Sequence, residues 1–294
     1  MNYFLFIITF CIVLFIYIHI NYQLSTSNDL EIFELESPWS KEILDNICYN
    51  KQPIKFNFSN DEILKNINLS FIEQQYNAFD IKIRNIKDDK DNKLHLPFSV
   101  GEISKLFEND TESTYITENN EDFLNETALI KIFKHNDNNL RPPWVSNCKY
   151  DFISGTKNSI IPLQYKISYR NFIMVTEGSV NLKLISPDYT KYLHLDKDYE
   201  NFYFYSPINC WDTQKEYQID YNKVKSLEIT LQQGDIVYIP SYWWYSIKFN
   251  QISSLSTFYY STYANTISIL PDLFINFLQN QNIKHKMNNI IETT

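Results

Sequence analysis

The chain has 294 residues, of which 44% are hydrophobic and 16% aromatic, so it can bury one sizeable core. Its formal net charge is −9, and no run of Lys or Arg offsets this acidic balance. Proteins that follow nucleic-acid phosphates carry a clustered basic face, so the composition argues against a nucleic-acid partner.

The first segment, residues 3–20, is YFLFIITFCIVLFIYIHI, which has no charge and only the mildly polar His19. A helix of this length spans about 27 Å, close to the hydrocarbon thickness of a bilayer. Signal peptides have a basic start and a shorter apolar stretch. We therefore predict a single-pass anchor in the lipid bilayer, with a cleaved signal peptide or a buried helix as alternatives. Neither flank has the basic cluster that fixes orientation, and an extracytosolic soluble domain is carried as a hypothesis.

Residues 21–36 are polar and acidic, and we expect them to form a tether. Residues 37–149 show a mixed pattern that predicts an α+β section. The expected helices and strands, together with a charged loop at 87–93, are as follows: helices at 39–46, 61–67, 99–107 and 120–133, and strands at 54–58 and 79–85.

From residue 150 to 265 the pattern changes to short β-branched and aromatic runs separated by turn residues, which is typical of a sandwich or barrel. The expected strands lie within 159–167, 171–178, 179–187, 225–233, 235–240, 245–249 and 253–264. Residues 266–294 predict a C-terminal helix with one apolar face, which is a candidate for docking or for homodimer formation. That face comprises Leu273, Phe274, Phe277 and Leu278.

Glycine and cysteine are both scarce. There are four glycines, and we expect them where a positive φ or a close backbone approach is required. With Cys11 in the anchor, Cys48, Cys148 and Cys210 permit one disulfide and one free thiol, or three small buried residues. No Cys/His spacing indicates zinc.

The stretch GDIVYIPSYWWYSI at 234–247 combines a glycine turn, an apolar strand, a proline corner and an aromatic cluster. Together with SGTKNSIIPLQYKISYRNFIMVTEGSVNLKLISP at 154–187, it resembles the cupin-like Jumonji C family of Fe(II)- and 2-oxoglutarate-dependent hydroxylases. The similarity covers about residues 37–265 and is weaker in its N-terminal part. It implies a mainly β fold with α-helices: a double-stranded β-helix, or cupin barrel, at 150–265, behind the α+β section at 37–149.

The resemblance also implies an iron site made by a His-x-Asp/Glu pair and a distant histidine. The matching positions are Gln164, Lys166 and Tyr245, and none carries the expected ligand. An ammonium about 4 Å from a dication is repelled by on the order of 8 kcal/mol at an effective dielectric of about 20. A tyrosine must lose a proton whose ordinary pKa is about 10. We therefore expect no metal, no cofactor and no catalytic residue.

The positions that match the family's co-substrate cation are Val180 or Asn181, with Lys183 nearby, while Asn171 matches a family asparagine. We expect a vestigial pocket that serves as core, as a site for a small anion near Lys166, or as a surface for a protein partner. Its predicted lining is Gln164, Lys166, Tyr169, Asn171, Tyr242, Trp244 and Tyr245.

Two alternatives remain open. The first is an active oxygenase with Fe(II) and 2-oxoglutarate and an unusual ligand set such as His194 and Asp196, which form a His-x-Asp pair. The second is an unrelated envelope or secreted β-sandwich whose aromatic residues bind a protein partner. The leading hypothesis is a membrane-anchored, catalytically inactive binding or structural module.

Overall fold

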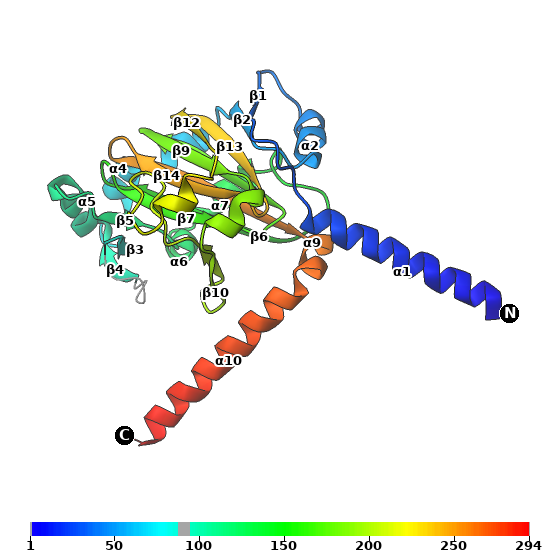
Figure 1. The fold of residues 1–294 in the computed structure, drawn as a ribbon. Coiled ribbons are helices and arrows are strands. Elements are labelled where there is room, and N and C mark those ends of the chain that lie inside the picture. The colour runs from blue at the N-terminus through cyan, green and yellow to red at the C-terminus, as the bar shows by residue number, and fades with distance from the viewer. Residues whose placement is uncertain (1, 88–94, 294) are drawn as a thin grey trace.

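The computed structural model describes residues 2–87 and 95–293, with side chains detailed to residue 282. Two β-sheets face each other, helices cover the larger sheet, and a long helix projects from each end of the chain (Figure 1). The predicted mainly β fold with helices is therefore confirmed.

The larger sheet carries most of the strands. Its order is β1 (Phe33–Leu35), β2 (Ile54–Asn57), β13 (Asp235–Pro240), β8 (Arg170–Glu177), β15 (Ser253–Thr262), β6 (Val145–Gly155), β5 (Tyr115–Thr117), β3 (Asp80–Asn85) and β4 (Leu96–Ser99). The smaller sheet runs β10 (Asp196–Asp198), β11 (Tyr203–Tyr205), β7 (Ile160–Tyr165), β14 (Trp244–Phe249), β9 (Ser179–Ile185) and β12 (Ser226–Gln232). Only the β1–β2 pair is parallel among the described strand pairs.

The helices fall into three groups along the chain. Before the barrel come α1 (Asn2–Leu24), α2 (Lys41–Tyr49), α3 (Asp61–Asn66), α4 (Leu69–Tyr76), α5 (Val100–Asn109), α6 (Glu121–Glu126) and α7 (Ile130–Asn136). Within the barrel lie the 3-10 helix Pro187–Tyr192 and α8 (Gln218–Tyr221). After it follow α9 (Tyr263–Ser268) and α10 (Leu270–Thr293).

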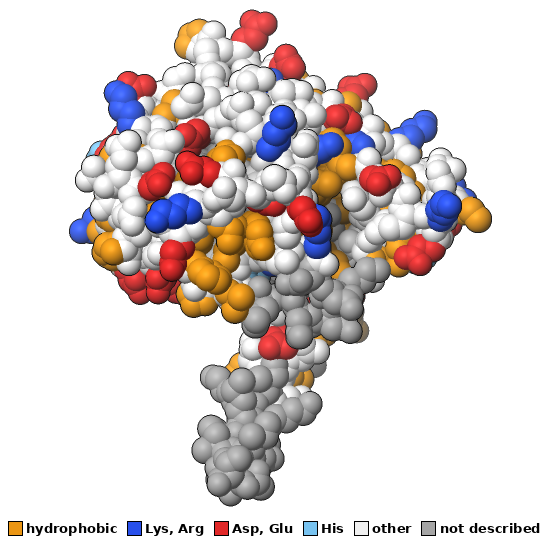
Figure 2. All heavy atoms as spheres, turned by 90° about the vertical axis from the view of Figure 1, so that its left-hand side faces the viewer, with side chains coloured by type: hydrophobic (Ala, Val, Ile, Leu, Met, Phe, Trp, Pro, Cys, Tyr) orange, Lys and Arg blue, Asp and Glu red, His pale blue; other side chains and the backbone are white. Residues whose placement is uncertain are grey.

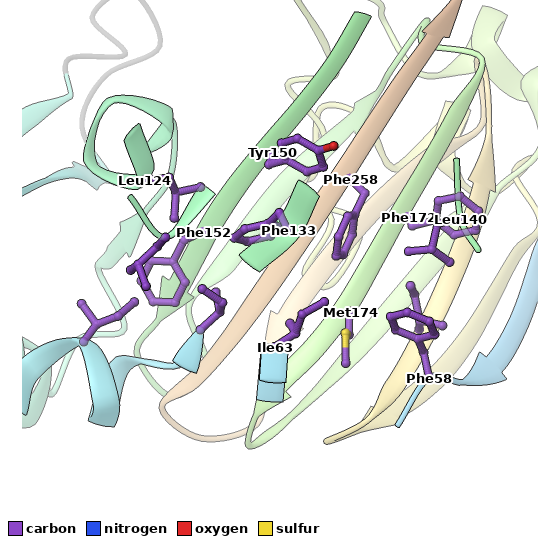
Figure 3. Packing of buried hydrophobic residues seen from close by; sticks show 14 of the residues in the cluster. Phe58, Ile63, Leu124, Phe133, Leu140, Tyr150, Phe152, Phe172, Met174 and Phe258 are labelled. Atoms are coloured by element: carbon purple, nitrogen blue, oxygen red, sulfur yellow. The ribbon is translucent and has the colours of Figure 1, made fainter. Parts of the chain in front are cut away.

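The outer core lies between the larger sheet and the helices of residues 37–149. Phe133 of α7 packs between Tyr150 of β6 and Phe258 of β15, with ring centroids 5.4 and 5.3 Å apart (Figure 3). Full burial of one such aromatic side chain contributes about 1.5–3 kcal/mol. The N-terminal section is thus packed onto the barrel through a shared core.

The inner core fills the space between the two sheets. Strands of the larger sheet supply Ile173, Val237 and Leu255, and strands of the smaller sheet supply Leu182 and Ile247. Because side chains alternate along a strand, Trp244 points to the opposite side of the smaller sheet. There it packs on Tyr165 in a third cluster.

Some predicted elements differ from the structure. The helix expected at 120–133 is two helices, because Ala128 has a φ of +59° and ends the first of them. Helix α4 was missed, although Asn68 caps it by accepting a hydrogen bond from the Phe71 amide at 2.8 Å. The segment between the strands expected at 179–187 and 225–233, for which no strand was predicted, contains β10 and β11 of the smaller sheet.

The expected tether, residues 21–36, is packed in the structure. It contains β1, and the Trp243 indole donates to the Ser27 carbonyl at 2.9 Å. The cysteines are all free, so the disulfide alternative is wrong. Most of the predicted charged loop at 87–93 lies outside the described residues.

Helix α1 contains an 18-residue segment with a mean hydropathy of 2.6 and is long and apolar enough to cross a membrane. None of this apolar segment is buried inside the domain, so the buried-helix alternative is wrong. Its C-terminal end packs on α9, and α10 leaves the same corner in another direction (Figure 1). On the face drawn in Figure 2, basic and acidic side chains are interspersed, without a continuous basic stripe.

Candidate ligand pocket

Strand pairing brings the three positions that match the family's metal ligands into one cavity. Tyr245 on β14 lies directly opposite Gln164 on β7 in the antiparallel register. Lys166 follows two residues after Gln164, just beyond the end of β7, and so faces the same side. All three line a cavity of about 770 Å³ that also reaches the ends of β3, β5 and β6.

Lys166 is the unusual member of this set. Its ammonium lies 5.3 Å from the ring centroid of Tyr203 and 5.7 Å from that of Tyr259. It forms no hydrogen bond or ion pair with any residue in the described part of the chain. Burial lowers the pKa of Lys166 to about 8, although the nearby Glu118 carboxylate opposes this shift. The pocket therefore holds a cation whose charge is only partly compensated.

An ion-pair network forms the neighbouring wall. Glu118 lies 3.1 Å from the Arg84 guanidinium and 3.2 Å from the His95 imidazole. Burial by itself would raise the pKa of Glu118, but Arg84 and His95 lower it to about 2. Glu118 is thus ionised at neutral pH and is already engaged by two other groups.

Asp151 lies on the same side of the cavity but is held by the backbone. Its carboxylate accepts hydrogen bonds from the amides of Asn119 at 2.8 Å, Asn120 at 2.7 Å and Phe152 at 2.9 Å. Burial raises the pKa of Asp151 to about 6, and the Asn120 and Asn119 amides oppose the shift. These contacts fix the connection after β5 against β6.

Two further polar side chains, those of Gln164 and Tyr245, line the cavity beside Lys166. Gln164 is 3% exposed, and its Oε1 has no hydrogen-bond partner. The pKa of Tyr245 is raised well above its ordinary value by burial and by Tyr259, which is also its hydrogen-bond partner. A buried amide oxygen without a donor costs free energy, so a bound water or ligand at this point would stabilise the pocket.

These residues do not fit an iron centre. Lys166 would repel a dication, Tyr245 is held in its protonated form, and Gln164 offers one neutral oxygen. Within the described residues, no group of three or more His, Cys, Asp or Glu side chains could hold a metal ion. What these residues present to the cavity is an ammonium, which attracts negative charge, and an amide oxygen, which accepts a hydrogen bond.

Four of the predicted lining residues lie elsewhere. Trp244 donates its indole N–H to Thr190 Oγ1 at 2.9 Å on the outer side of the smaller sheet, and Tyr242 lies near it against Tyr165. Asn171 is buried, and its amide donates to the carbonyls of Ser168 and Ile239.

Tyr169 stacks near the guanidinium of Arg170, away from the cavity. Strand alternation accounts for Trp244, which precedes Tyr245 on β14 and so points to the other face. Tyr169 and Tyr242 lie outside the strands, and Asn171 is held by hydrogen bonds to backbone carbonyls.

The two side chains of the candidate pair His194 and Asp196 do not point to a common site. His194 lies in a turn with a φ of +48° and interacts with Asp220 at 3.1 Å. Asp196 instead accepts a hydrogen bond from the Tyr205 hydroxyl across β10 and β11. Both side chains are exposed, and nothing in their geometry forms a shared metal site.

The candidate co-substrate positions contribute no cation to the cavity. Val180 belongs to the inner core, and Asn181 accepts from the Thr230 hydroxyl at 3.0 Å. Lys183 points to the opposite side, where it donates to the Cys210 carbonyl at 2.9 Å and lies over the Trp211 ring.

Sequence reasoning missed the polar wall of the pocket. Arg84, His95, Glu118 and Asp151 come from the α+β section or the start of the barrel and are distant in sequence from Gln164. Tyr259, which also lines the cavity, is the one missed residue that strand alternation could have indicated, because it lies within the strand expected at 253–264.

One comparison with known proteins identifies the architecture. A family model described as a cupin-like domain matches residues 37–266, which agrees with the span over which the sequence resembles that fold. No curated protein matches the chain. The match overturns the alternative of an unrelated β-sandwich.

Proposed function

The chain belongs to the cupin-like family, and we propose that it is a membrane-anchored binding protein whose barrel holds a small anion at Lys166. In this proposal the pocket carries out no metal-dependent oxidation. The observation that carries it is the Lys166 ammonium, which faces a cavity of about 770 Å³ without an ion-pair partner in the described residues.

The contacts around Lys166 favour a carboxylate or a similar anion. An anion would supply the missing charge at close range, where a pair of charges in a partly buried site interacts by several kcal/mol. A donor group on the same molecule would satisfy Gln164 Oε1, which is two residues away. The tyrosine rings of Tyr203 and Tyr259 would enclose the apolar part of the ligand.

The anchor is supported by α1. The helix is uncharged over residues 3–20, and its side chains there are unpacked against the domain. The same properties occur in signal sequences, so retention of residues 3–20 in the mature chain is part of the proposal. Its check is the mass of the protein recovered from membranes.

The experiment is a melting measurement on the full-length protein in phosphatidylcholine nanodiscs. With EDTA present, succinate and 2-oxoglutarate are titrated as probe dicarboxylates. We expect a saturable rise in melting temperature, because a ligand that binds only the folded state stabilises it. The variant Lys166→Met should lose this rise.

The matched control is Lys149→Met, which removes an exposed lysine from the mouth of the same cavity. This variant should keep at least most of the ligand-induced shift. Three outcomes would each overturn the proposal. These are a rise in melting temperature that persists in Lys166→Met, no rise with either probe, or a rise that requires Fe(II) or Mn(II). Stoichiometric iron in the purified protein would do the same.

A further inference from the structure

An apolar stripe runs along α9 and the first half of α10. Its members recur every three or four residues, the spacing that places side chains on one face of a helix. All are large, and all are between 45% and 62% exposed. The stripe comprises Tyr263, Ile267, Leu270, Phe274, Phe277 and Leu278.

The opposite side of α10 is the side that contacts the domain. Asp272 accepts a hydrogen bond from the Tyr199 hydroxyl at 2.9 Å, and Asn276 donates to the Tyr199 carbonyl at 2.5 Å. Leu273 packs beside them against the third hydrophobic cluster. A helix on a water-facing surface normally turns its apolar stripe inward and its polar face outward. This helix has the reverse arrangement, and soluble proteins rarely expose such a stripe unless it binds something.

The position of the stripe identifies what covers it. Helix α9, where the stripe begins, packs on the end of α1 that joins the domain (Figure 1). Trp144 lies at the same corner, 83% exposed, and its carbonyl accepts from the Tyr263 amide at 3.2 Å. Exposed Trp and Tyr side chains of this kind are enriched at the boundary between a bilayer and water.

Helix α10 also runs across the direction of α1 rather than alongside it (Figure 1). It is not itself a membrane-spanning candidate, since α1 is the single such helix among the described residues. A helix that begins at the foot of a spanning segment, is directed away from it and exposes an apolar stripe over its first half has the placement of an interfacial helix.

We propose that α9 and α10 lie on the surface of the bilayer that α1 enters, with the apolar stripe inserted among the lipids. This inference rests on the proposed role of α1 as an anchor. It gives the protein two contacts with one membrane, a spanning helix and a surface helix, and thereby fixes the orientation of the barrel above the lipid.

The test is photo-crosslinking of the full-length protein in phosphatidylcholine vesicles. The photoreactive residue p-benzoylphenylalanine replaces Phe277 in the stripe, or Gln279, which is exposed on the other face of α10, or Phe10 within α1. Intact mass after illumination distinguishes a lipid adduct from a covalent dimer. The same substitution at a second stripe position, Phe274, tests whether a negative result at Phe277 reflects only the orientation of that one side chain. Each variant must have the melting temperature of the wild type.

We expect a lipid adduct at Phe10 and Phe277 and several-fold less at Gln279. Three results at α10 would overturn the surface-helix inference while a lipid adduct at Phe10 leaves the anchor intact. These are a covalent dimer at Phe277 and Phe274, no lipid adduct at either position, or a lipid adduct at Gln279 as strong as at Phe277. Absence of a lipid adduct at Phe10 overturns the anchor, and with it this inference.

Discussion

At the residue scale, the main feature of the pocket is the Lys166 ammonium, which loses hydration free energy when the chain folds. Its ammonium faces two tyrosine rings, which return only part of that free energy, since a cation over an aromatic face contributes about 0.5–2 kcal/mol. Glu118 is the nearest source of compensation but is engaged by Arg84 and His95. Folding therefore leaves Lys166 able to gain from an added anion.

Anion affinity should consequently depend on pH through Lys166. The pKa of Lys166 is lowered to about 8, so the ammonium is fully present at pH 7 and disappears above pH 8. The pKa of Glu118 is about 2 and that of Asp151 about 6, so both are ionised throughout this range. We expect the dissociation constant for succinate, measured by calorimetry, to rise about tenfold per pH unit above pH 8.

The same shift affects the stability of the free protein. The folded-state pKa lies below the ordinary value of 10.5, so the unfolded chain binds the Lys166 proton more tightly. The protonated lysine therefore destabilises the fold below pH 8, and this penalty is relieved as the pH rises toward 10.5. Lys149→Met should keep the loss of succinate affinity at high pH and move it to slightly higher pH, because Lys149 contributes to lowering the pKa of Lys166. A dissociation constant that does not change with pH in the wild type would contradict the assignment.

At the element scale, the barrel depends on close approaches between strands that only glycine permits. A Cβ added to Gly155, at the end of β6, would lie 2.6 Å from a ring carbon of Phe249 and 2.8 Å from Ser159 Oγ. Phe249 is fully buried in the inner core, so its ring has no space into which it can withdraw. The end of β6 therefore lies close against the end of β14 in the smaller sheet.

We expect Gly155→Ala to reduce the free energy of unfolding by about 1–3 kcal/mol, because the added methyl group overpacks the core. Urea unfolding in detergent, followed by circular dichroism, measures the loss. The control is Gly101→Ala in α5, where the added Cβ would meet the Asn77 side chain, which can rotate away. An equal or larger loss for Gly101→Ala would contradict this explanation.

Most of these elements could be predicted from local signals. The strands from β7 to β15 follow β-branched and aromatic runs, and the expectation that glycine occurs at a positive φ is confirmed at Gly178 and Gly234. Other elements could not be predicted, because their evidence is tertiary. Strand β11 pairs with β10 on one side and with β7 on the other, where Tyr205 lies opposite Gln164. No local sequence pattern encodes the pairing with β7.

At the scale of the whole molecule, α1 is joined rigidly to the barrel. Lys51 is 4% exposed and donates to the carbonyls of Tyr22, Gln23 and Ser25, which form the C-terminal end of α1. A cation at this end also interacts favourably with the helix dipole. Burial lowers the pKa of Lys51 to about 8, a cost offset by these three acceptors.

The variant Lys51→Met should loosen this junction. We expect faster hydrogen exchange of the amides at residues 23–27, because the helix end loses hydrogen bonds to a charged donor, each worth about 1.5–3 kcal/mol. Exchange within the barrel should stay slow. Lys55→Met, which breaks the 3.2 Å pair with Asp235 on the same segment, serves as the control and should leave residues 23–27 unchanged.

The sequence by itself determined the span of the cupin-like domain, the apolar N-terminal helix and the residue types at Gln164, Lys166 and Tyr245, because residue type, hydrophobic periodicity and motif order are local properties. Only the tertiary structure decided that Gln164, Lys166 and Tyr245 meet in one cavity, and that Trp244 and Tyr242 do not. The physical reason is strand register: pairing between distant segments fixes which face each side chain occupies. The same applies to α10, whose apolar face was visible in the sequence, whereas its outward direction depends on the docking of Asp272 and Asn276.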